Sequence, residues 1–222
     1  MAMMTRCSIC LLRHSEVDAS WRGRIYGSLD APLSERGREQ SRAAAAGLAG
    51  IPFAAVISSG LERAEDTAAH LRTRIGPRSE RIDDVRLREI DRGRWAGWNE
   101  AQVEADQPGG WGAFWGGGGL VIPPEGETLA QLQQRVVEAL DEYAARFAPG
   151  PIAIVAHRWV LRVAGAHALG WPLEKCVRVE VPYAGMLVLD WPAEADARPP
   201  GLVLASARAT RGWEAAVSSQ PG

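Results

Sequence analysis

The chain has 222 residues, 46% of them hydrophobic, and no change in composition divides it, so we predict one domain spanning residues 1–222 with a sizeable core. Its formal net charge is -2 at pH 7, which excludes the broadly basic surface of a nucleic-acid-binding protein and of a polybasic membrane-binding protein.

Short apolar runs alternate with longer helical patterns in the first half of the chain. Ser34 is a typical N-cap before an alanine-rich stretch, and Gly50 is typical of the end of such a helix. Apolar residues recur again at helical spacing after Gly60. We therefore predict strands over residues 7–12, 54–58 and 81–88, and helices over residues 34–49 and 61–75.

Residues 92–126 differ in character from the rest of the chain. They contain Pro123-Pro124, a run of glycines from Gly116 to Gly119, and the tryptophans Trp95, Trp98, Trp111 and Trp115. One interpretation is a mobile aromatic cover over a site, and the other is an irregular excursion packed against the body. We predict a lid or insertion here.

The second half repeats the alternation. Thr128 and Gln131 form a capping box for a helix that continues to about Phe147. The later segments are a strand over residues 152–156, a helix over 159–169, strands over 185–191 and 202–205, a loop over 192–200 and a frayed tail after residue 213. The whole pattern predicts an α/β three-layer sandwich, in which helices cover both faces of a mostly parallel central sheet.

The cysteines and the hydropathy pattern bear on the compartment. Cys7 and Cys10 have the spacing of a metal or redox pair, but residues three apart on a strand point to opposite faces and cannot share one ion. The first apolar run ends at Arg13, which is too early for a signal peptide, and no later run approaches a membrane span. We expect reduced, packed cysteines in a cytoplasmic protein.

Basic and polar residues follow three of the predicted strands directly. Arg13-His14 ends the first run, Ser58-Ser59 ends another just before Arg63, and His157 ends a third. Ligands of open α/β sheets bind beyond the carboxyl ends of the strands, so these side chains should line one pocket. Imidazole with several guanidinium groups is suited to phosphoryl chemistry.

Each residue of this set has an expected role. Transfer of a phosphoryl group to histidine needs a neutral ring with one free nitrogen and its other nitrogen held, as at His14. Arg13, Arg63 and His157 would neutralise the phosphate oxygens, and Glu89 would protonate the leaving oxygen and later activate water. His70 and His167 lie on predicted helices and are expected to be structural or surface residues.

A metal site is the alternative for the same region. It would use His14, Glu16, Asp18 and His157, which are suitable ligand types. No carboxylate cluster accompanies the second histidine, so we predict neither a metal nor an organic cofactor.

Several stretches together resemble a known family. They are Leu-Leu-Arg-His-Ser-Glu at 11–16, Gly27 to Gly37 with Leu-Asp-Ala-Pro-Leu-Ser-Glu-Arg-Gly, Ser-Ser-Gly-Leu-Glu-Arg-Ala-Glu-Asp-Thr-Ala at 58–68, Leu-Arg-Glu at 87–89 with Gly93 and Trp95, Pro-Pro-Glu-Gly-Glu-Thr at 123–128, and Val-Ala-His at 155–157. Over most of residues 6–170 the chain resembles the histidine phosphatase superfamily, the phosphoglycerate-mutase-like group. The resemblance implies that His14 is phosphorylated, that Arg13, Arg63 and His157 form its phosphate pocket, and that Glu89 is the proton donor.

The chain also departs from that family's pattern. Ser15 replaces a usual glycine, Ser20 a common phosphate-binding asparagine, and Arg158-Trp159 a small pair after the second histidine. We expect substrate contacts at Ser20, Tyr26, Gly27 and Arg158. Arg158 either adds a cation to the site or narrows its mouth.

The segment after Glu89 bears on the reaction. It reads Ile-Asp-Arg-Gly-Arg-Trp, and Tyr26 stands where the glycolytic mutases have a small serine, so we favour hydrolysis over mutase action. The resemblance is greatest to the phosphatases of the α-ribazole-phosphate type. We predict a metal-independent phosphomonoester hydrolase that acts on a small phosphorylated metabolite through a phosphohistidine.

Two other functions stay open, a phosphoglycerate mutase and a catalytically weak phosphate-binding or protein-binding module. No nucleic-acid or membrane partner is expected, and a homodimer is compatible with the sequence.

Overall fold

Six strands form one sheet in the order β3-β2-β4-β1-β5-β6 in the computed structural model, which describes residues 5–76, 78–194 and 199–206. Four strands run parallel: β1 (Arg6–Arg13), β2 (Ala55–Ser58), β3 (Glu80–Asp83) and β4 (Ile152–Ala156). β5 (Met186–Pro192) is antiparallel to β1, and β6 (Gly201–Ser206) is antiparallel to β5. The predicted mostly parallel sheet is confirmed, and its antiparallel part is confined to one edge.

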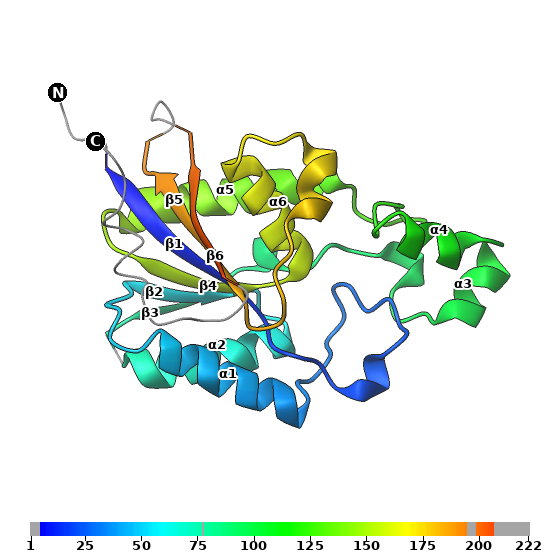
Figure 1. Ribbon diagram of the computed structural model, residues 1–222, viewed down its shortest axis with the longest axis horizontal. Helices are drawn as coiled ribbons and strands as arrows, with labels where there is room; N and C mark the ends of the chain where they lie inside the picture. Colours follow the sequence, from blue (N-terminus) through cyan, green and yellow to red (C-terminus); the bar gives the residue numbers. More distant parts are fainter. Residues whose placement is uncertain (1–4, 77, 195–198, 207–222) are drawn as a thin grey trace.

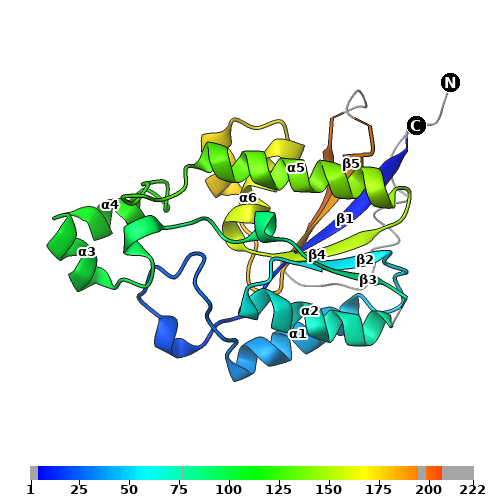
Figure 2. The same ribbon diagram turned by 180° about the vertical axis from the view of Figure 1, so that it is seen from behind.

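Helices cover both faces of this sheet, as predicted. One face carries α1 (Glu35–Gly47) and α2 (Glu62–Ile75), and the other carries α5 (Leu129–Phe147) and α6 (Arg158–Ala168) (Figure 1, Figure 2). Alternate residues of β1 pack into separate cores, with Cys7 in the core under α5 and α6 and Cys10 in the core under α1 and α2. The two thiols therefore lie on opposite faces of the sheet, and burial raises the pKa of each to about 12.

Several predicted boundaries are confirmed by the capping contacts. The Ser34 hydroxyl accepts a hydrogen bond from the Gly37 N–H at 2.9 Å and starts α1. Thr128 and Gln131 form the reciprocal capping box that starts α5. β4 begins and ends at the predicted residues, because a run of fully buried apolar side chains fits only a central strand.

The strand predicted over residues 81–88 is wrong in its second half. β3 ends at Asp83, and a 3₁₀ helix, η2 (Val85–Leu87), follows it. The Asp84 carboxylate accepts the backbone N–H of Arg86 at 2.8 Å and the Tyr143 hydroxyl at 2.7 Å. This local bond competes with a strand ladder, and β3 is the edge strand of the described sheet, paired on one side only.

The segment over residues 92–126 leaves the sheet layers as a lateral excursion. It contains the 3₁₀ helix η3 (Gly93–Trp95) and two short helices, α3 (Glu100–Asp106) and α4 (Gly110–Gly116), that the sequence analysis did not predict (Figure 1). Trp95 is fully buried in a small core that the excursion forms with Ile25. This core agrees with the interpretation that the tryptophans pack the excursion.

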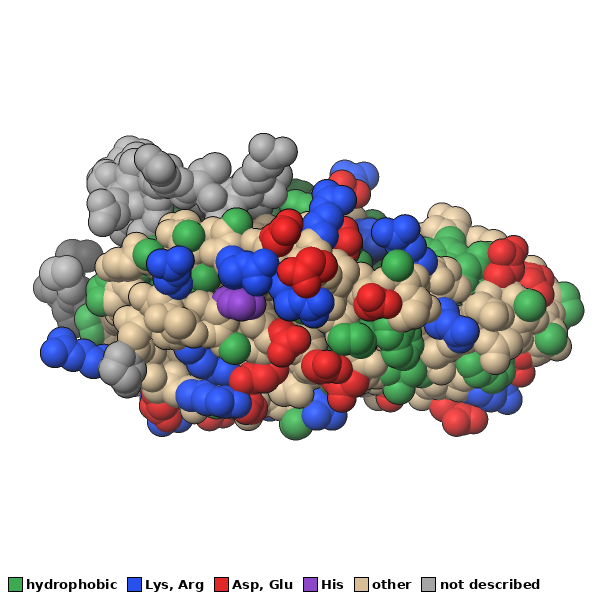
Figure 3. All heavy atoms as spheres, turned by 90° about the horizontal axis from the view of Figure 1, so that it is seen from below, with side chains coloured by type: hydrophobic (Ala, Val, Ile, Leu, Met, Phe, Trp, Pro, Cys, Tyr) green, Lys and Arg blue, Asp and Glu red, His purple; other side chains and the backbone are tan. Residues whose placement is uncertain are grey.

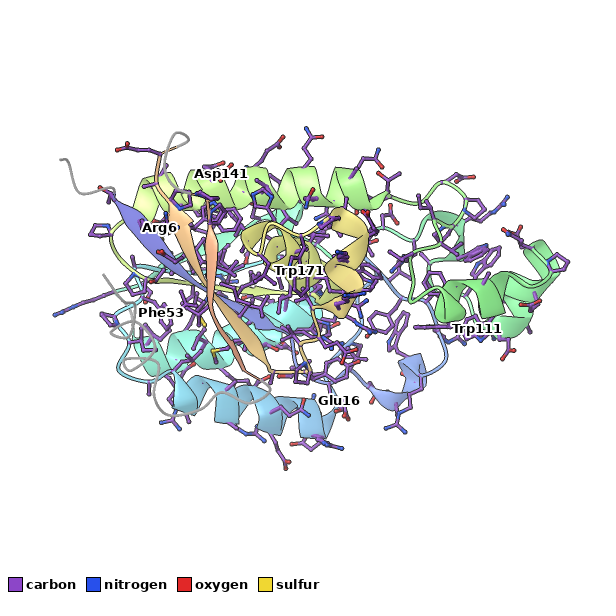
Figure 4. The ribbon with its side chains drawn as sticks, turned by 45° about the horizontal axis from the view of Figure 1, so that its top comes forward. Arg6, Glu16, Phe53, Trp111, Asp141 and Trp171 are labelled. Atoms are coloured by element: carbon purple, nitrogen blue, oxygen red, sulfur yellow. The ribbon has the colours of Figure 1, made fainter. Side chains whose placement is uncertain are left out.

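Hydrogen bonds close the base of this excursion. The Arg94 N–H donates to the Pro124 carbonyl at 2.9 Å, and the Glu127 N–H donates to the Asp91 carbonyl at 3.0 Å. Figure 4 shows Trp111 in the excursion, well away from Glu16, which lies just past β1. The two ends of the excursion are therefore joined side by side.

Two further 3₁₀ helices, η1 (Ala19–Trp21) and η4 (Leu173–Arg178), lie in the connections. Acidic and basic side chains are interspersed on the face that carries α1 and α2 (Figure 3). Among the described residues no helix is both long and apolar enough to span a bilayer. The predicted frayed tail after residue 213 and residues 195–198 of the predicted loop lie outside the described residues.

Candidate active site

A cavity of about 340 Å³ opens beyond the carboxyl ends of the parallel strands. Its walls come from the end of β1, the segment around Tyr26, Glu89, the excursion and the first turn of α6. The cavity therefore lies at the predicted edge of the sheet, and of the residues that follow the predicted strands Arg13 and His14 line it. Residues that line it include Arg13, His14, Glu16, Tyr26, Gly27, Glu89, Arg92, Arg158, Trp159 and Tyr183.

His14 follows β1 directly and is almost fully buried. Its Nε2 lies 3.3 Å from Arg63 Nε, and a guanidinium can only donate, so Nε2 is the unprotonated nitrogen. Nδ1 then carries the proton and donates it to the Ser15 carbonyl at 2.8 Å. One nitrogen is held and the other faces cations, which is the arrangement that phosphoryl transfer requires.

The environment of His14 keeps its ring neutral. Burial lowers the pKa of the imidazole well below 6.5, and the positive charges of Arg63 and Arg13 lower it further. A neutral ring has a free lone pair at neutral pH, so the nucleophile needs no separate base.

His157 lies beside this ring at the end of β4, with 5.1 Å between the ring centroids. It is fully buried, and its Nε2 is 2.7 Å from the Ser59 hydroxyl, whereas Nδ1 has no hydrogen-bond partner among the described residues. Burial lowers the pKa of His157 as well, followed by the charge of Arg63. The sheet thus places His14 and His157 together through the adjacent strands β1 and β4.

Arg63 lies in the first turn of α2 and is fully buried. Its two terminal nitrogens each donate at 2.6 Å, to the Gly27 and Leu29 carbonyls. Gly27 has a φ of 45°, and a Cβ there would lie 2.8 Å from Arg92 Cγ. Gly27 therefore contributes a fixed carbonyl to the site, and its close approach to Arg92 leaves no room for a side chain.

Arg13 lies over the ring of Tyr183, with Cζ 4.1 Å from the ring centroid. Its Nη1 donates to the Val181 carbonyl at 2.8 Å, whereas its Nε is buried without a hydrogen bond in the described structure. The Tyr26 hydroxyl lies 3.4 Å from that of Tyr183. Tyr26 and Tyr183 thus form an aromatic wall beside the two arginines.

Glu89 also lines the cavity and is 8% exposed. Its Oε1 accepts the backbone N–H groups of Ile90 and Trp159, both at 3.1 Å. Within the described part of the chain no hydrogen bond reaches Oε2. One oxygen is therefore fixed by the first turn of α6, and the other is available to a ligand.

The Ser15 side chain points away from the cavity into a buried hydroxyl network. Its Oγ accepts from the Ser41 hydroxyl at 2.8 Å, and its backbone N–H donates to Thr67 Oγ1 at 3.2 Å. Thr67 in turn donates to the Arg63 carbonyl at 2.8 Å. Ser41 and Thr67 accommodate the serine between α1 and α2, and this explains how the chain tolerates it beside His14.

Three predicted site residues are not among those that line the cavity: Arg63 and His157, which are fully buried beside His14, and Ser20. Ser20 is exposed, and its hydroxyl donates to Asp18 Oδ1 at 2.7 Å, outside the residues that line the cavity. No group of three or more His, Cys, Asp or Glu side chains in the described ranges is placed to hold a metal ion. His14, Glu16, Asp18 and His157 therefore do not converge as the metal alternative required.

Sequence reasoning missed several residues of the site. Arg92 and Tyr183 line the cavity, and neither lies next to a predicted catalytic residue in the chain. Ser41 and Thr67 were missed because a small hydroxyl inside a predicted helix has many possible partners. A signal was present in their positions, since both lie on the buried faces of α1 and α2.

The chain belongs to the histidine phosphatase superfamily (branch 1). The model of that family matches residues 9–197. The chain is 34% identical over 174 residues to the glucosyl-3-phosphoglycerate phosphatase of Mycolicibacterium vanbaalenii, covering 75% of this chain and 76% of that protein. It is 32% identical over 157 residues to the metal-independent phosphoserine phosphatase of Arabidopsis thaliana, covering 69% of this chain and 65% of that protein.

A solved structure is similar over nearly the whole chain. The α-ribazole phosphatase from Shigella flexneri superposes with a TM-score of 0.76 at 25% identity, over 92% of this chain and 98% of that one. The family and the phosphatase class predicted from the sequence are therefore confirmed.

Proposed function

We propose that this protein hydrolyses monoesters of small phosphorylated metabolites through a phosphohistidine at His14, without a metal ion. The observation that carries the proposal is the fixed tautomer of His14, whose Nδ1–H is bonded to the Ser15 carbonyl while Nε2 faces Arg63. Similarity to a glucosyl-3-phosphoglycerate phosphatase and a metal-independent phosphoserine phosphatase supports a small substrate.

The reaction would have two steps. In the first, the ester phosphate binds among Arg13, Arg63 and His157, and His14 Nε2 forms a bond to phosphorus while the bond to the ester oxygen breaks. Glu89 Oε2 gives its proton to that oxygen, and the alcohol leaves.

In the second step the same carboxylate accepts a proton from water. The resulting hydroxide oxygen bonds to phosphorus, the bond to Nε2 breaks, and inorganic phosphate is released. Glu89 is then protonated again, as the next cycle requires. Glu16 also lines the cavity, but its Oε1 accepts from the Ser34 hydroxyl at 3.1 Å, and Asp91 is not among the lining residues. Glu89 is therefore the carboxylate that we assign as the acid.

Trapping the intermediate tests this proposal. A phosphomonoester labelled on phosphorus is mixed with the protein and quenched without acid, and the label should be found on His14. His14→Ala should lose the label and several orders of magnitude in turnover, because the nucleophile is removed. His70→Ala, a change on α2 outside the cavity, is the matched control and should keep both.

The result also separates the other two functions. Label that persists in His14→Ala contradicts the proposal. Transfer of the label to a second metabolite, rather than to water, identifies a mutase. Tight binding of the ester with no label and no turnover identifies a binding module.

A further inference from the structure

The two arginines next to His14 have no acidic partner. Arg63 Nε lies 3.3 Å from His14 Nε2, and Arg13 precedes His14 in the chain. No carboxylate of the described residues lies within 4.0 Å of either guanidinium group. Burial lowers the pKa of both arginines, but a guanidinium remains charged at neutral pH. Groups other than carboxylates therefore hold two like charges beside one histidine.

A tyrosine ring covers one face of each guanidinium group. Arg13 Cζ lies 4.1 Å from the ring centroid of Tyr183, and Arg63 Cζ lies 5.2 Å from that of Tyr26. The two tyrosine hydroxyls are 3.4 Å apart, within hydrogen-bonding distance. Burial raises the pKa of Tyr26, so its hydroxyl is protonated at neutral pH. The tyrosine pair, Tyr26 with Tyr183, thus connects the two arginines through neutral rings whose faces attract a cation.

The N–H groups of the two arginines are used unequally. Arg63 donates through all three of its nitrogens, to His14 Nε2 and to the Gly27 and Leu29 carbonyls. In the described structure Arg13 donates through Nη1 alone, to the Val181 carbonyl at 2.8 Å, and its buried Nε has no partner. The N–H groups that Arg13 leaves free are those that a phosphate oxygen can accept.

The backbone holds the Tyr183 ring against Arg13. The Arg13 N–H donates to the Gly185 carbonyl at 2.9 Å, and the Ala184 N–H donates to the His14 carbonyl at 3.4 Å. Ala184 has a φ of 55°, a conformation that residues other than glycine keep only where their surroundings fix it. The turn that carries Tyr183 is therefore attached to both residues at the end of β1.

An aromatic ring leaves more of an arginine free than a carboxylate would. A carboxylate accepts the N–H groups in the plane of the guanidinium, neutralises its charge and occupies the positions that a phosphate needs. A ring contacts the face of the guanidinium and leaves its edge free to donate. The tyrosine pair can therefore hold the two charges in place without neutralising them.

We infer that Tyr26 and Tyr183 are positioning residues, which hold Arg63 and Arg13 in the geometry that a phosphoryl group requires. The inference rests on the proposed function, which places the phosphate of the substrate at these arginines. Tyr183 has the larger share of this role, because it is closer to its arginine and because that arginine has the free N–H groups.

Binding of inorganic phosphate tests the inference without turnover. The Kd is measured by phosphorus NMR titration of the whole protein. Tyr183→Leu should raise the Kd by about threefold to thirtyfold, the range that a cation–π contact contributes when it is partly removed from water. Tyr183→Phe should stay within about twofold of wild type, because the ring is retained. Phe147→Leu is the matched control: it removes a ring that lies 4.9 Å from Arg146 Cζ on α5, outside the cavity, and should keep the wild-type Kd.

A double-mutant cycle separates positioning from general damage to the site. In an Arg13→Gln background Tyr183→Leu should change the Kd by less than about twofold, because the cation on which the ring acts is gone. An equal loss in both backgrounds would contradict the inference. It would also be contradicted by a wild-type Kd in Tyr183→Leu, or by the same loss in Tyr183→Phe as in Tyr183→Leu. Tyr26→Leu and Tyr26→Phe give the same comparison if Tyr183→Leu does not fold.

The outcomes also separate this inference from the proposed function. If the Kd values follow the expected order but no label is found on His14, the proposed hydrolysis is wrong and the positioning role stands. If His14 is labelled but Tyr183→Leu keeps the wild-type Kd, the positioning role is wrong and the hydrolysis stands. If the wild type binds no phosphate, both are wrong.

Discussion

Mild acid should destabilise this protein through its two site histidines. His14 and His157 are fully buried, and their pKa values are lowered well below 6.5 by burial first and by nearby arginines second. In the unfolded chain both rings regain a pKa near 6.5. The unfolded state therefore binds more protons below that value, so the stabilisation is complete above it and is lost as the pH falls.

The magnitude follows from the width of that window. One pH unit corresponds to about 1.4 kcal/mol for each group that is protonated only in the unfolded state. When the pH falls from about 7.5 to about 5.5, it ends roughly one unit below the pKa of histidine in the unfolded chain. The free energy of unfolding should therefore fall by about 1.4 kcal/mol for each histidine and by about 3 kcal/mol for the pair. The half-buried His167 acts in the same direction, because burial lowers its pKa too.

Urea unfolding followed by the fluorescence of the nine tryptophans measures this effect at the two pH values. Wild type is compared with His14→Asn, His157→Asn and the control His70→Asn. Between the two pH values the free energy of unfolding should fall by about 1.4 kcal/mol less in each site variant than in wild type, because asparagine does not titrate. Carboxylates with lowered pKa values, such as Asp84, act in every variant and cancel in this difference. An equal loss in wild type and in both site variants would refute the reasoning.

Three further predictions concern catalysis and the hydroxyl network. Glu89→Gln should slow phosphoenzyme formation from alkyl esters by about 10² or more relative to aryl esters, because aryl leaving groups need little protonation. If single-turnover measurements show equal slowing for the two classes of ester, Glu89 is excluded as the acid. Turnover should persist in excess chelator, because arginines and histidines replace the metal charge; loss with chelator and recovery with a divalent ion would contradict this. Thr67→Val leaves the buried Ser15 N–H without its acceptor, so the free energy of unfolding should fall by about 1–3 kcal/mol. The kcat should fall as well, because the hydroxyl network would no longer position His14. A kcat like that of wild type would show that the network does not position His14.

The sheet and the ends of its inner strands were predictable because local pattern and tertiary burial agree there. The run from Ile152 to Ala156 is apolar throughout and lies between β1 and β2, so only a central strand satisfies it. His14 and His157 follow two adjacent parallel strands, and the rule that sites lie at carboxyl ends brings them together without any knowledge of the loops.

Other features depend on contacts between residues far apart in the chain. Arg92 looks like a surface charge in sequence, but Phe114, Trp159 and the Gly119 carbonyl enclose it. Ser20 shows the reverse: it is a candidate site residue in sequence, but its hydroxyl donates to the neighbouring Asp18 and does not reach the cavity. Helices α3 and α4 have seven residues each, too short for a periodic apolar pattern to identify them.

The junction between β4 and α6 connects the two halves of the site. The His157 ring lies beside that of His14, Arg158 lines the cavity, and the Trp159 N–H fixes the proposed acid Glu89. β4 is hydrogen-bonded on both sides, so these three consecutive residues start from a rigid base. Arg92 and Gly119 belong instead to the excursion, and the hydrogen bond between them lies outside the sheet. We therefore expect a substitution in the excursion to affect substrate preference more than phosphoryl transfer, whereas a substitution at the junction should disturb His157, Arg158 and the hydrogen bond to Glu89 together.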